Sequence, residues 1–355
     1  MRPKGLFMKR LLLIVLLAGV LSGCTLSPST QTDPSPATPS PSSTPTPTPS
    51  PSPTPVIYRS PLTGEQVPAP PPRPIAVQID NAPGARPHTG LTDADLVYET
   101  PTEAQLTRFT AFYQTRQPEV VGPARSARLV DLQVVPAHDA MLAFSGASSG
   151  VQARLWDSGI DQLFLEDNAT EASWRDPNRY APHNLFTSIA ALRKVADRLG
   201  WSRPTGGQSF DFGPVPEGGS PSSGATIPYS AGNVEFTFNP ATQTYDRFMA
   251  GAPHVDALTG KQISPRNVVV LFATFTQTDI VEDTLGELSL DVALQGSGDA
   301  WVFRDGKRFE TRWERNAGSG TFHFIDVASG KSVPLAEGQS WICLTTTTFG
   351  AAAKP

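Results

Sequence analysis

The sequence predicts an α+β protein in which an N-terminal mixed α/β domain (residues 57–203) precedes a smaller, mostly antiparallel β domain (residues 226–346). Three observations support this class. In the first region, short apolar runs alternate with segments of helical periodicity, which is typical of layered α/β and α+β folds. Residues 204–225 are rich in Gly, Ser and Pro and predict a linker. The second region shows period-two alternation and little helical periodicity.

Residues 1–23 predict a signal peptide. Four basic residues precede the uncharged run Leu11–Val20, which matches the basic and apolar parts of an export signal. Ten residues rise about 15 Å as a helix, half of a bilayer core of roughly 30 Å, so a stable membrane span is not predicted. Leu21-Ser-Gly-Cys24 matches the lipobox of bacterial lipoproteins. We therefore expect acyl chains such as palmitate on Cys24, which would hold the exported protein on the outer face of the cell membrane. The alternative is an ordinary cleavage site near a chance cysteine.

Residues 24–56 predict a disordered stalk behind the lipidated cysteine. Residues 26–55 contain 11 prolines, and Asp33 is their only charged residue. Such a Pro/Ser/Thr segment cannot bury a core and stays extended and solvated. At about 3.1 Å per residue, roughly 31 residues could hold the folded part on the order of 100 Å from the membrane. Ser and Thr beside Pro also suit O-glycosylation, and a ligand for a Pro-binding module is the alternative.

The predicted N-terminal domain contains four strands and three helices. Its strands are 75–79, 95–99, 107–113 and 140–144, and its helices are 126–135, 151–156 and 187–199. The last helix has the clearest pattern, because its apolar residues share one face. Thr187 or Ser188 can cap its start, and Gly200 can end it.

The predicted C-terminal domain consists of strands. They are 234–238, 267–275, 301–304, 307–310, 322–325 and 340–345. Asp305-Gly306 stands between two of these strands and predicts a tight hairpin. Residues 347–355 read as an unstructured tail.

Charge and cysteine content exclude several classes of protein. The chain has 28 Lys and Arg against 33 Asp and Glu, and without residues 1–23, which hold four basic residues, the balance is 24 − 33 = −9. An acidic chain is not a nucleic-acid binder driven by net charge. Two cysteines exclude a disulfide scaffold. We predict no cofactor, and no feature identifies a protein partner.

Several phrases, taken in their order and spacing, resemble the YerB-like bacterial lipoproteins. They include Pro61-Leu-Thr-Gly64, Ala94-Asp-Leu-Val-Tyr-Glu99, Gly122-Pro-Ala-Arg-Ser-Ala-Arg128, Ala181-Pro-His-Asn184 and Ala300-Trp-Val-Phe-Arg-Asp-Gly306. The resemblance covers nearly all of residues 60–345. It implies an exported lipoprotein with an N-terminal α/β and a C-terminal β-rich domain of unknown function, and it supplies no substrate or catalytic set. The end of the chain after Trp341 departs from the family pattern.

The densest group of polar residues lies between positions 80 and 128 and predicts a ligand site. Its candidate residues are Asp80, Asn81, Arg86, His88, Glu99, Glu103, Arg108, Arg125, Ser126 and Arg128. If a helix begins near Arg125, this residue and Arg128 share a face, where arginine forks bind carboxylate or phosphate. An anionic envelope polymer or fragment is the expected ligand. The alternative is that these arginines pair with Asp95, Glu99 or Glu103 and only pin loops.

Two further motifs raise the possibility of an enzyme. His183 and Asn184 precede the clearest helix, where a histidine can act as acid, base or ligand. Gly146-Ala-Ser148-Ser-Gly150 matches G-x-S-x-G after an apolar strand, with His183, His254 or His323 as the possible base. Both motifs also fit structural loops, which need only small residues and a cap. The five histidines show no zinc-ligand spacing, so no metal site is predicted.

Two observations in the C-terminal region complete the list of candidates. Cys343 stands alone once Cys24 is lipidated, and it is predicted to be a buried apolar residue rather than a reactive thiol. The aromatic residues near the hairpin could stack on a sugar ring or pack in the core. They are Trp301, Phe303, Phe309 and Trp313. Together the observations favour a lipid-anchored binding or scaffolding module of the cell envelope. The alternative is an envelope hydrolase that uses Ser148 or His183.

Overall fold

The structure is a computed structural model that describes residues 56–230, 232–316, 320–347 and 350–355. The predicted signal peptide, Cys24 and the predicted stalk up to residue 55 lie outside the described residues. The described part belongs to one compact unit. None of its helices is long and apolar enough to cross a bilayer.

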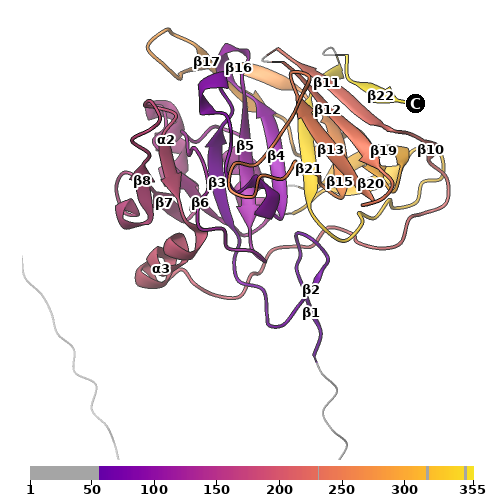
Figure 1. The fold of residues 1–355 in the computed structure, drawn as a ribbon, viewed down its shortest axis with the longest axis horizontal. Helices are drawn as coiled ribbons and strands as arrows, with labels where there is room; N and C mark the ends of the chain where they lie inside the picture. The colour runs from indigo at the N-terminus through magenta and orange to yellow at the C-terminus, as the bar shows by residue number, and fades with distance from the viewer. Residues whose placement is uncertain (1–55, 231, 317–319, 348–349) are drawn as a thin grey trace, which may run out of the picture. The chain divides into compact units, whose positions relative to one another are not determined.

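A sheet of eleven strands runs through the whole described body (Figure 1). In spatial order its strands are β10 (Ser220–Pro221), β19 (Lys307–Arg315), β18 (Gly296–Arg304), β15 (Asn267–Phe272), β21 (Ser340–Thr345), β4 (Leu96–Pro101), β5 (Thr107–Tyr113), β3 (Ile75–Asp80), β6 (Met141–Phe144) and β7 (Gln162–Phe164), with β20 (His323–Asp326) added beside β19.

Strand β21 joins the two sequence regions into this one sheet. It pairs in parallel with β15 on one side and with β4 on the other. Its residue Ile342 lies opposite Val269 in one neighbour and Tyr98 in the other. Strands from both predicted domains therefore share one hydrogen-bond ladder at the centre of the sheet.

A smaller sheet and three two-stranded ribbons complete the β-structure. The smaller sheet has the order β14 (Ala252–Pro253), β13 (Thr244–Met249), β12 (Gly232–Asn239), β11 (Gly224–Tyr229) and β22 (Ala352–Lys354). The ribbons are β1 (Tyr58–Arg59) with β2 (Gln66–Val67), β8 (Ser173–Arg175) with β9 (Leu185–Thr187), and β16 (Phe275–Val281) with β17 (Leu288–Val292).

Three α-helices lie in the described residues: α1 (Asp131–Ala137), α2 (Ser149–Asp157) and α3 (Ile189–Leu199). The clearest predicted helix is confirmed as α3: Ser188 caps it by accepting a hydrogen bond from Ala191, and Gly200 ends it with φ 74°. The helix predicted from residue 126 begins only at Asp131. The reason is that the backbone before it is paired elsewhere, since the Arg125 amide donates to Gln78 of β3 (2.9 Å). The expectation that Arg125 and Arg128 share a helix face is therefore wrong.

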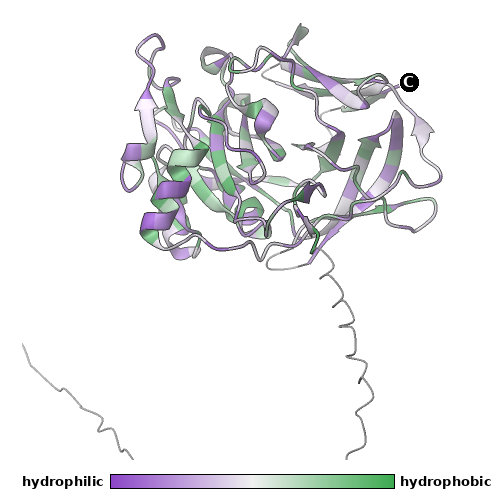
Figure 2. Ribbon diagram, turned by 60° about the horizontal axis from the view of Figure 1, so that its bottom comes forward, coloured by the Kyte–Doolittle hydropathy of each residue, from purple (hydrophilic) through white to green (hydrophobic). Residues whose placement is uncertain are grey.

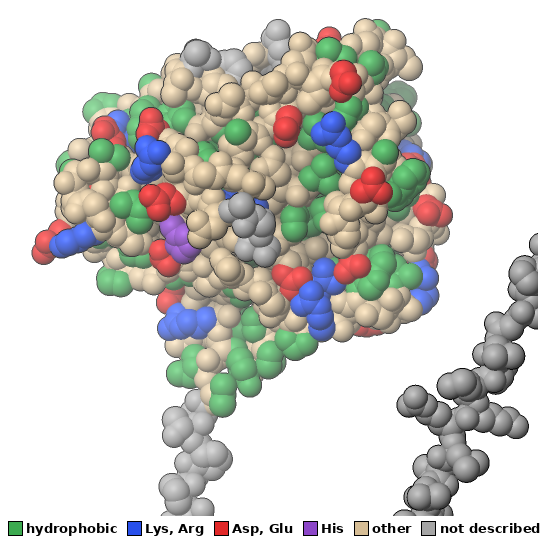
Figure 3. Space-filling view, turned by 180° about the vertical axis from the view of Figure 1, so that it is seen from behind, with side chains coloured by type: hydrophobic (Ala, Val, Ile, Leu, Met, Phe, Trp, Pro, Cys, Tyr) green, Lys and Arg blue, Asp and Glu red, His purple; other side chains and the backbone are tan. Residues whose placement is uncertain are grey.

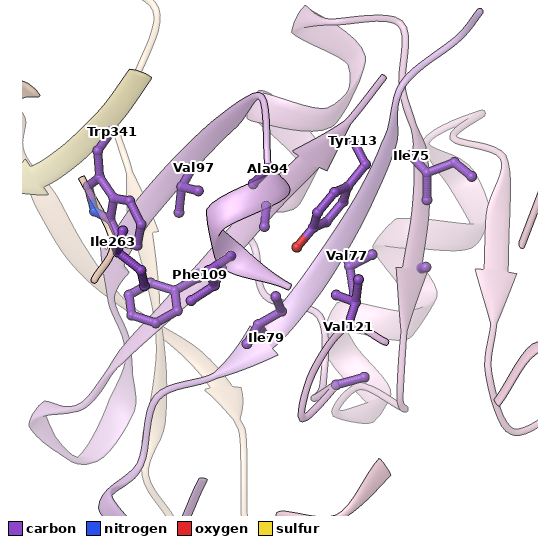
Figure 4. Close-up of a cluster of buried hydrophobic side chains, with 14 of the residues drawn as sticks. Ile75, Val77, Ile79, Ala94, Val97, Phe109, Tyr113, Val121, Ile263 and Trp341 are labelled. Atoms are coloured by element: carbon purple, nitrogen blue, oxygen red, sulfur yellow. The ribbon is translucent and has the colours of Figure 1, made fainter. Parts of the chain in front are cut away.

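The central strands of the main sheet, β15, β21, β4, β5, β3 and β6, are buried on both faces (Figure 2). Alternate side chains of a strand point to opposite faces, so Val77 packs with α3 and the smaller sheet in one cluster, while Ala76 packs with α1 and α2 in the other. Figure 4 shows the first cluster, where Phe109 of β5 meets Trp341 of β21. Burial on both faces explains why central strands such as β3 and β15 contain nearly continuous apolar runs, whereas β19 alternates buried and exposed residues.

Two predictions on the fold need correction. The α+β class overstates the helical part, because the described residues are mostly sheet with three helices. The predicted tail contributes β22, which pairs with the edge of β11 and is tied by a hydrogen bond from Ser222 Oγ to the Lys354 carbonyl (2.7 Å). The Asp305-Gly306 hairpin is confirmed: it links β18 and β19 with positive φ at both residues (50° and 70°).

Candidate functional site

The candidate site lies where three parallel strands of the main sheet end. Strands β3, β6 and β7 run parallel, so their carboxyl ends meet at one edge. Open α/β sheets bind ligands at this edge. Asp80 is the last residue of β3, Ser145 follows β6, and Glu166 lies two residues after β7. The Ser145 hydroxyl donates to the Glu166 carboxylate (3.0 Å), which links two of the strand ends.

Asp80 is the centre of the cluster. Its carboxylate accepts hydrogen bonds from His183 Nδ1 (2.7 Å) and from the Ala82 amide (3.1 Å). Arg125 Nε lies 3.3 Å and Arg108 Nη1 3.7 Å from its oxygens. Burial by itself raises the pKa of Asp80, but the charge of Arg108 and the hydrogen bonds to the carboxylate hold this pKa below its ordinary value. Asp80 is therefore an ionised carboxylate among cationic groups.

Part of this cluster is open to solvent. The side chains of Arg125 and His183 are 30% and 26% exposed, whereas that of Asp80 is 3% exposed. Gly84 lies against the His183 ring, because a Cβ at this position would stand 2.9 Å from His183 Cδ2. The ring is thus held between the carboxylate and a close backbone, and a ligand could reach it together with Arg125.

The loop of residues 176–184 carries His183 and is fixed by its own side chains. Arg179 Nη2 donates to the Ala85 carbonyl (2.6 Å), and Asp80 lies within electrostatic reach of the Arg179 guanidinium. Arg175 Nη1 donates to Asn184 Oδ1 (2.8 Å) at the end of the loop. These bonds pre-organise the loop, which lowers the entropy cost of binding a ligand.

A second group of charges lies deeper in the same part of the fold. Arg128 forms an ion pair and hydrogen bonds with Glu103, and its Nη1 lies 3.5 Å from Glu282. Arg108 Nη2 reaches Glu103 at 3.4 Å. The side chains of all four residues are at most 8% exposed. This group holds the ribbon β16–β17 and the turn at residues 103–105 against the sheet. The alternative expectation, that these arginines pair with acidic residues and hold loops, therefore applies to Arg128 and Glu103.

Some buried donors next to Asp80 have no hydrogen-bond partner among the described residues. They are Nε and Nη1 of Arg108 and Nε2 of Gln78, in side chains whose residues are 4% and 0% exposed. An unpaired buried donor costs free energy, although Arg108 Nη1 keeps an ionic contact of 3.7 Å with Asp80.

The opposite face of the sheet holds a fully buried network that joins the two sequence regions. Glu99 of β4 accepts a hydrogen bond from Arg247 Nη2 of β13 (2.9 Å), and both side chains are 0% exposed. Trp341 Nε1 also donates to Glu99 (3.1 Å). The Arg247 guanidinium lies 4.6 Å from the Trp341 ring centroid and 5.4 Å from that of Phe109. The aromatic rings and the carboxylate thus replace the water that this cation loses.

A chain of histidines connects this network to Asp80. Since a guanidinium only donates, the hydrogen bond from Arg247 Nη1 makes His254 Nδ1 an acceptor. His254 Nε2 then donates to His88 Nδ1 (2.8 Å), and His88 Nε2 donates to the Asp80 carbonyl (2.8 Å). These hydrogen bonds fix one tautomer for the neutral ring of His254 and one for that of His88. It also ties the position of Asp80 to the contact between the two regions.

Comparisons with known proteins identify the family. The model of "Protein of unknown function (DUF3048) N-terminal domain" matches residues 62–202, and the model of the corresponding C-terminal domain matches residues 225–342. The chain belongs to the DUF3048 family. It is 30% identical over 279 residues to "Putative lipoprotein YerB" of Bacillus subtilis (strain 168), covering 76% of this chain and 80% of the relative. It is similar to the crystal structure of the Bacillus subtilis YerB protein, with a TM-score of 0.73, 28% identity, and coverage of 84% of this chain and 99% of that one. The matches confirm the resemblance to YerB-like proteins and fit the two-domain organisation.

In this DUF3048 protein, part of the predicted site residues converge. Asp80, Arg108, Arg125 and His183 meet directly. Asn184 joins the cluster through Arg175. Ser126 follows Arg125 on the same loop, and its carbonyl accepts from Arg128 (3.3 Å).

Other predicted residues lie elsewhere. Glu99 and His88 belong to the network on the opposite face. Asn81 Nδ2 donates to Thr107 (2.6 Å), and its carbonyl accepts from Arg86 Nη2 (3.1 Å). The sequence analysis placed these residues in one group because they are close in sequence, whereas the sheet separates its two faces.

Four residues of the edge were missed by the sequence analysis. They are Ser145, Glu166, Arg175 and Arg179. Ser145 could have been found, because it directly follows a predicted strand and strand ends gather at one edge. Glu166 follows the three-residue strand β7, which is too short to stand out in a sequence pattern.

The G-x-S-x-G motif forms the start of a helix. The Ser148 side chain caps α2 by accepting a hydrogen bond from the Val151 amide (3.5 Å), and among the described residues it contacts no histidine. His183 bonds Asp80, His254 bonds His88, and His323 lies 3.3 Å from Asp211. Within the described residues no group of three His, Cys, Asp or Glu side chains could hold a metal ion.

The C-terminal candidates divide into buried and accessible residues. Cys343 is 0% exposed, which confirms that this cysteine is buried, and burial raises the pKa of its thiol. Phe303, Phe309 and Trp313 are also buried in the core. Trp301 is partly exposed.

Proposed function

We propose that the protein is an exported, lipid-anchored binding module of the cell envelope, and that its N-terminal region binds an anionic ligand at the Asp80 edge. The lipobox at Cys24 and the similarity to a relative named as a lipoprotein support the anchor. The convergence of cationic groups on one carboxylate supports the binding site.

The charge balance at the edge favours an anion. Asp80 faces Arg125, Arg108 and His183, and Arg179 lies within its electrostatic reach. Arg108 shares its charge with Glu103. Arg179 also lies within the electrostatic reach of Asp176. The partly exposed Arg125 is therefore the cation of this edge that can bind an anion, because the Asp80 carboxylate is already shared with Arg108 and His183.

The geometry of the donors favours a carboxylate or phosphate group. Arg125 contacts Asp80 through Nε, so its terminal nitrogens remain able to form a two-pronged bond to an oxyanion. Nη1 of Arg108 lies 3.7 Å from the same carboxylate, and neither it nor Nε of Arg108 forms a hydrogen bond among the described residues. The surface seen in Figure 3 carries acidic and basic side chains in small mixed groups, so the proposed affinity comes from this local arrangement and not from a patch of one sign.

The binding proposal predicts that Arg125→Lys lowers the affinity for an anionic envelope fragment by about tenfold. Lysine keeps the positive charge but cannot form the two-pronged hydrogen bond of a guanidinium. Titration calorimetry against a muropeptide and against polyglycerol phosphate measures this change, with inorganic phosphate as a third probe. The melting temperature should stay nearly unchanged, since Arg125 is partly exposed.

The matched control is Arg154→Lys, at an exposed arginine of α2. It should leave both binding and melting unchanged. Arg128 is unsuitable for this test because it belongs to the buried ion pairs with Glu103 and Glu282. If the wild-type protein binds none of the three probes, the proposed site is contradicted.

The hydrolase alternative is favoured by one observation, the bond between Asp80 and His183. A carboxylate that accepts from Nδ1 orients the ring and leaves Nε2 free to take a proton from water. Mass spectrometry of the same titration mixtures distinguishes the two functions. A product formed by the wild type and lost in His183→Ala identifies a hydrolase, whereas unchanged ligand identifies a binder.

The anchor proposal predicts that Cys24→Ser moves the protein from the membrane fraction to the soluble fraction. Intact-mass analysis of the wild-type protein should show acyl additions, because several acyl chains are needed for stable anchoring. Cys343→Ala, at the buried cysteine, is the control and should remain in the membrane fraction. A wild-type protein with an unmodified Cys24 would contradict the anchor.

A further inference from the structure

A groove crosses the main sheet near its other end, in the C-terminal region. It consists of two adjoining hollows of about 400 and 230 Å³, which share Phe272 and Asp299 in their walls. The walls come from the end of β15 and from β18 and β19. Ligand sites in proteins have volumes of this order and combine an apolar wall with a few polar groups. The groove is separate in sequence and in strand order from the edge at Asp80.

The larger hollow has an aromatic wall with a fixed orientation. Trp301 lines it and is partly exposed. The ring of Phe272 meets the Trp301 ring edge-on, with centroids 5.0 Å apart and an angle of 79°. The Arg308 guanidinium lies over the Trp301 ring at 5.3 Å. Two neighbours thus hold the indole in place before any ligand arrives.

The polar groups of the groove are hydroxyls, an amide and a free carboxylate. Asp299 is exposed and has no hydrogen bond or ion pair among the described residues. Thr274, Gln295 and Ser297 line the smaller hollow beside it. The larger hollow therefore offers the aromatic surface of Trp301, and the smaller hollow beside it offers polar side chains that can bind hydroxyls.

Basic residues next to the groove partly balance its acidic residues. Glu310 pairs with Arg308 (2.7 Å). Asp299 lies opposite Arg312 in the register of β18 and β19, and Arg312 itself donates to Ser297 (2.5 Å). The residues that line the two hollows include the acidic Asp299 and Glu310 and no basic residue, so the groove has no excess positive charge to recruit an anionic polymer.

We infer that this groove binds an uncharged glycan, with one sugar ring packed on Trp301 and neighbouring hydroxyls bound by Asp299. A pyranose ring has an apolar face of C–H groups that packs on an aromatic ring, and its adjacent hydroxyls can donate to both oxygens of one carboxylate. An organic cation would also pack on the indole, but Arg308 already supplies a cation there. The two hollows in a row suit a chain of sugars rather than one ring.

The inference is tested by measuring how three probes bind to the purified protein. Saturation-transfer NMR and tryptophan fluorescence detect the binding. The probes are an N-acetylglucosamine tetramer, maltotetraose and, as the anionic comparison, polyglycerol phosphate. At least one uncharged oligosaccharide should bind. Asp299→Ala should weaken binding by at least about tenfold, because the carboxylate that accepts hydrogen bonds from two hydroxyls is lost. Because Asp299 is exposed and unpaired, this variant should melt at the wild-type temperature.

Two further variants make the outcome decisive. Asp157→Ala, at an exposed aspartate of α2, should bind like the wild type, and Trp301→Leu should abolish the transfer signal from the sugar. Absence of binding by both oligosaccharides, or binding that Asp299→Ala and Trp301→Leu leave unchanged, would overturn the inference. Arg125→Lys should not alter glycan binding, so the result here is independent of the Asp80 site.

Discussion

Replacing Arg247 with Met is expected to lower the free energy of unfolding by about 3–5 kcal/mol, because the Glu99 carboxylate would remain buried without its cation. Both side chains are 0% exposed in the wild-type protein. Thr107 and Trp341 still donate to Glu99, but neutral donors do not replace a guanidinium charge. Equilibrium unfolding in urea measures the loss.

A double variant and a surface control complete this test. Adding Glu99→Leu to Arg247→Met removes the unpaired carboxylate and should recover much of the stability, since apolar replacement of a whole buried pair is often neutral. Arg198→Met breaks an ion pair whose side chains are 51% and 54% exposed, and it should have no measurable effect. A loss in Arg247→Met no larger than that in Arg198→Met would show that the network does not stabilise the fold.

Acidification below pH 6.5 is expected to destabilise the protein strongly, because several histidines are buried in the neutral form. Burial lowers the pKa of His88 to about 3 and that of His138 to about 3, and it also lowers the pKa of His254 well below its ordinary value. Between pH 6.5 and 3 the unfolded chain therefore binds more protons than the folded protein, so stability falls as the pH falls. One histidine with a pKa of about 3 contributes up to about 5 kcal/mol over this window.

Single variants isolate the contribution of each group. His138→Phe keeps a ring among Tyr98, Phe112 and Phe210 and should reduce the slope of stability against pH by about 1.4 kcal/mol per pH unit. Urea unfolding at several pH values between 7 and 4 gives the slope. A slope identical to that of the wild type would show that His138 is protonated in the folded state.

Asp131 changes the stability with pH in the opposite direction to the histidines over part of this pH range. Burial raises its pKa to about 6, so between the unfolded value near 3.8 and this value the folded state binds the extra proton. Its contribution to stability is therefore present at low pH and is lost as the pH rises through 6. The histidines outnumber it, which leaves the net effect of acid destabilising.

The local features of the fold were predictable where neighbouring residues decide them. Ser188 and Gly200 set the ends of α3, and Asp305-Gly306 set the β18–β19 hairpin, because caps and tight turns depend on a few adjacent residues. The helix expected from residue 126 begins only at Asp131, because the backbone before it is paired elsewhere, as in the hydrogen bond from the Arg125 amide to the Gln78 carbonyl. β22 was missed because its partner is β11, more than a hundred positions away.

The candidate site was predictable only as a region. The polar residues between positions 80 and 128 include Asp80 and Arg125, which the structure brings together, and their residue types predicted an anionic ligand. The separation of Asp80 from Glu99 follows from the alternation of strand faces, which requires the register of β3, β4 and β5. Glu166 enters the edge through the parallel pairing of β6 with β7, for which the sequence carries no local signal.

The sequence alone thus predicts an export signal with a lipobox, and it contains a proline-rich segment, two regions of different periodicity and the phrases of a family resemblance, because each of these can be read from residue types along the chain. The tertiary structure decides that both regions share one sheet, with β21 placed between β15 and β4. It also decides that Arg247 is a buried partner of Glu99 and that Arg125 is a partly exposed partner of Asp80. The physical reason is that burial and pairing of a charged side chain depend on residues distant in sequence. The same residue type therefore stabilises the interior in one place and can bind a ligand in another.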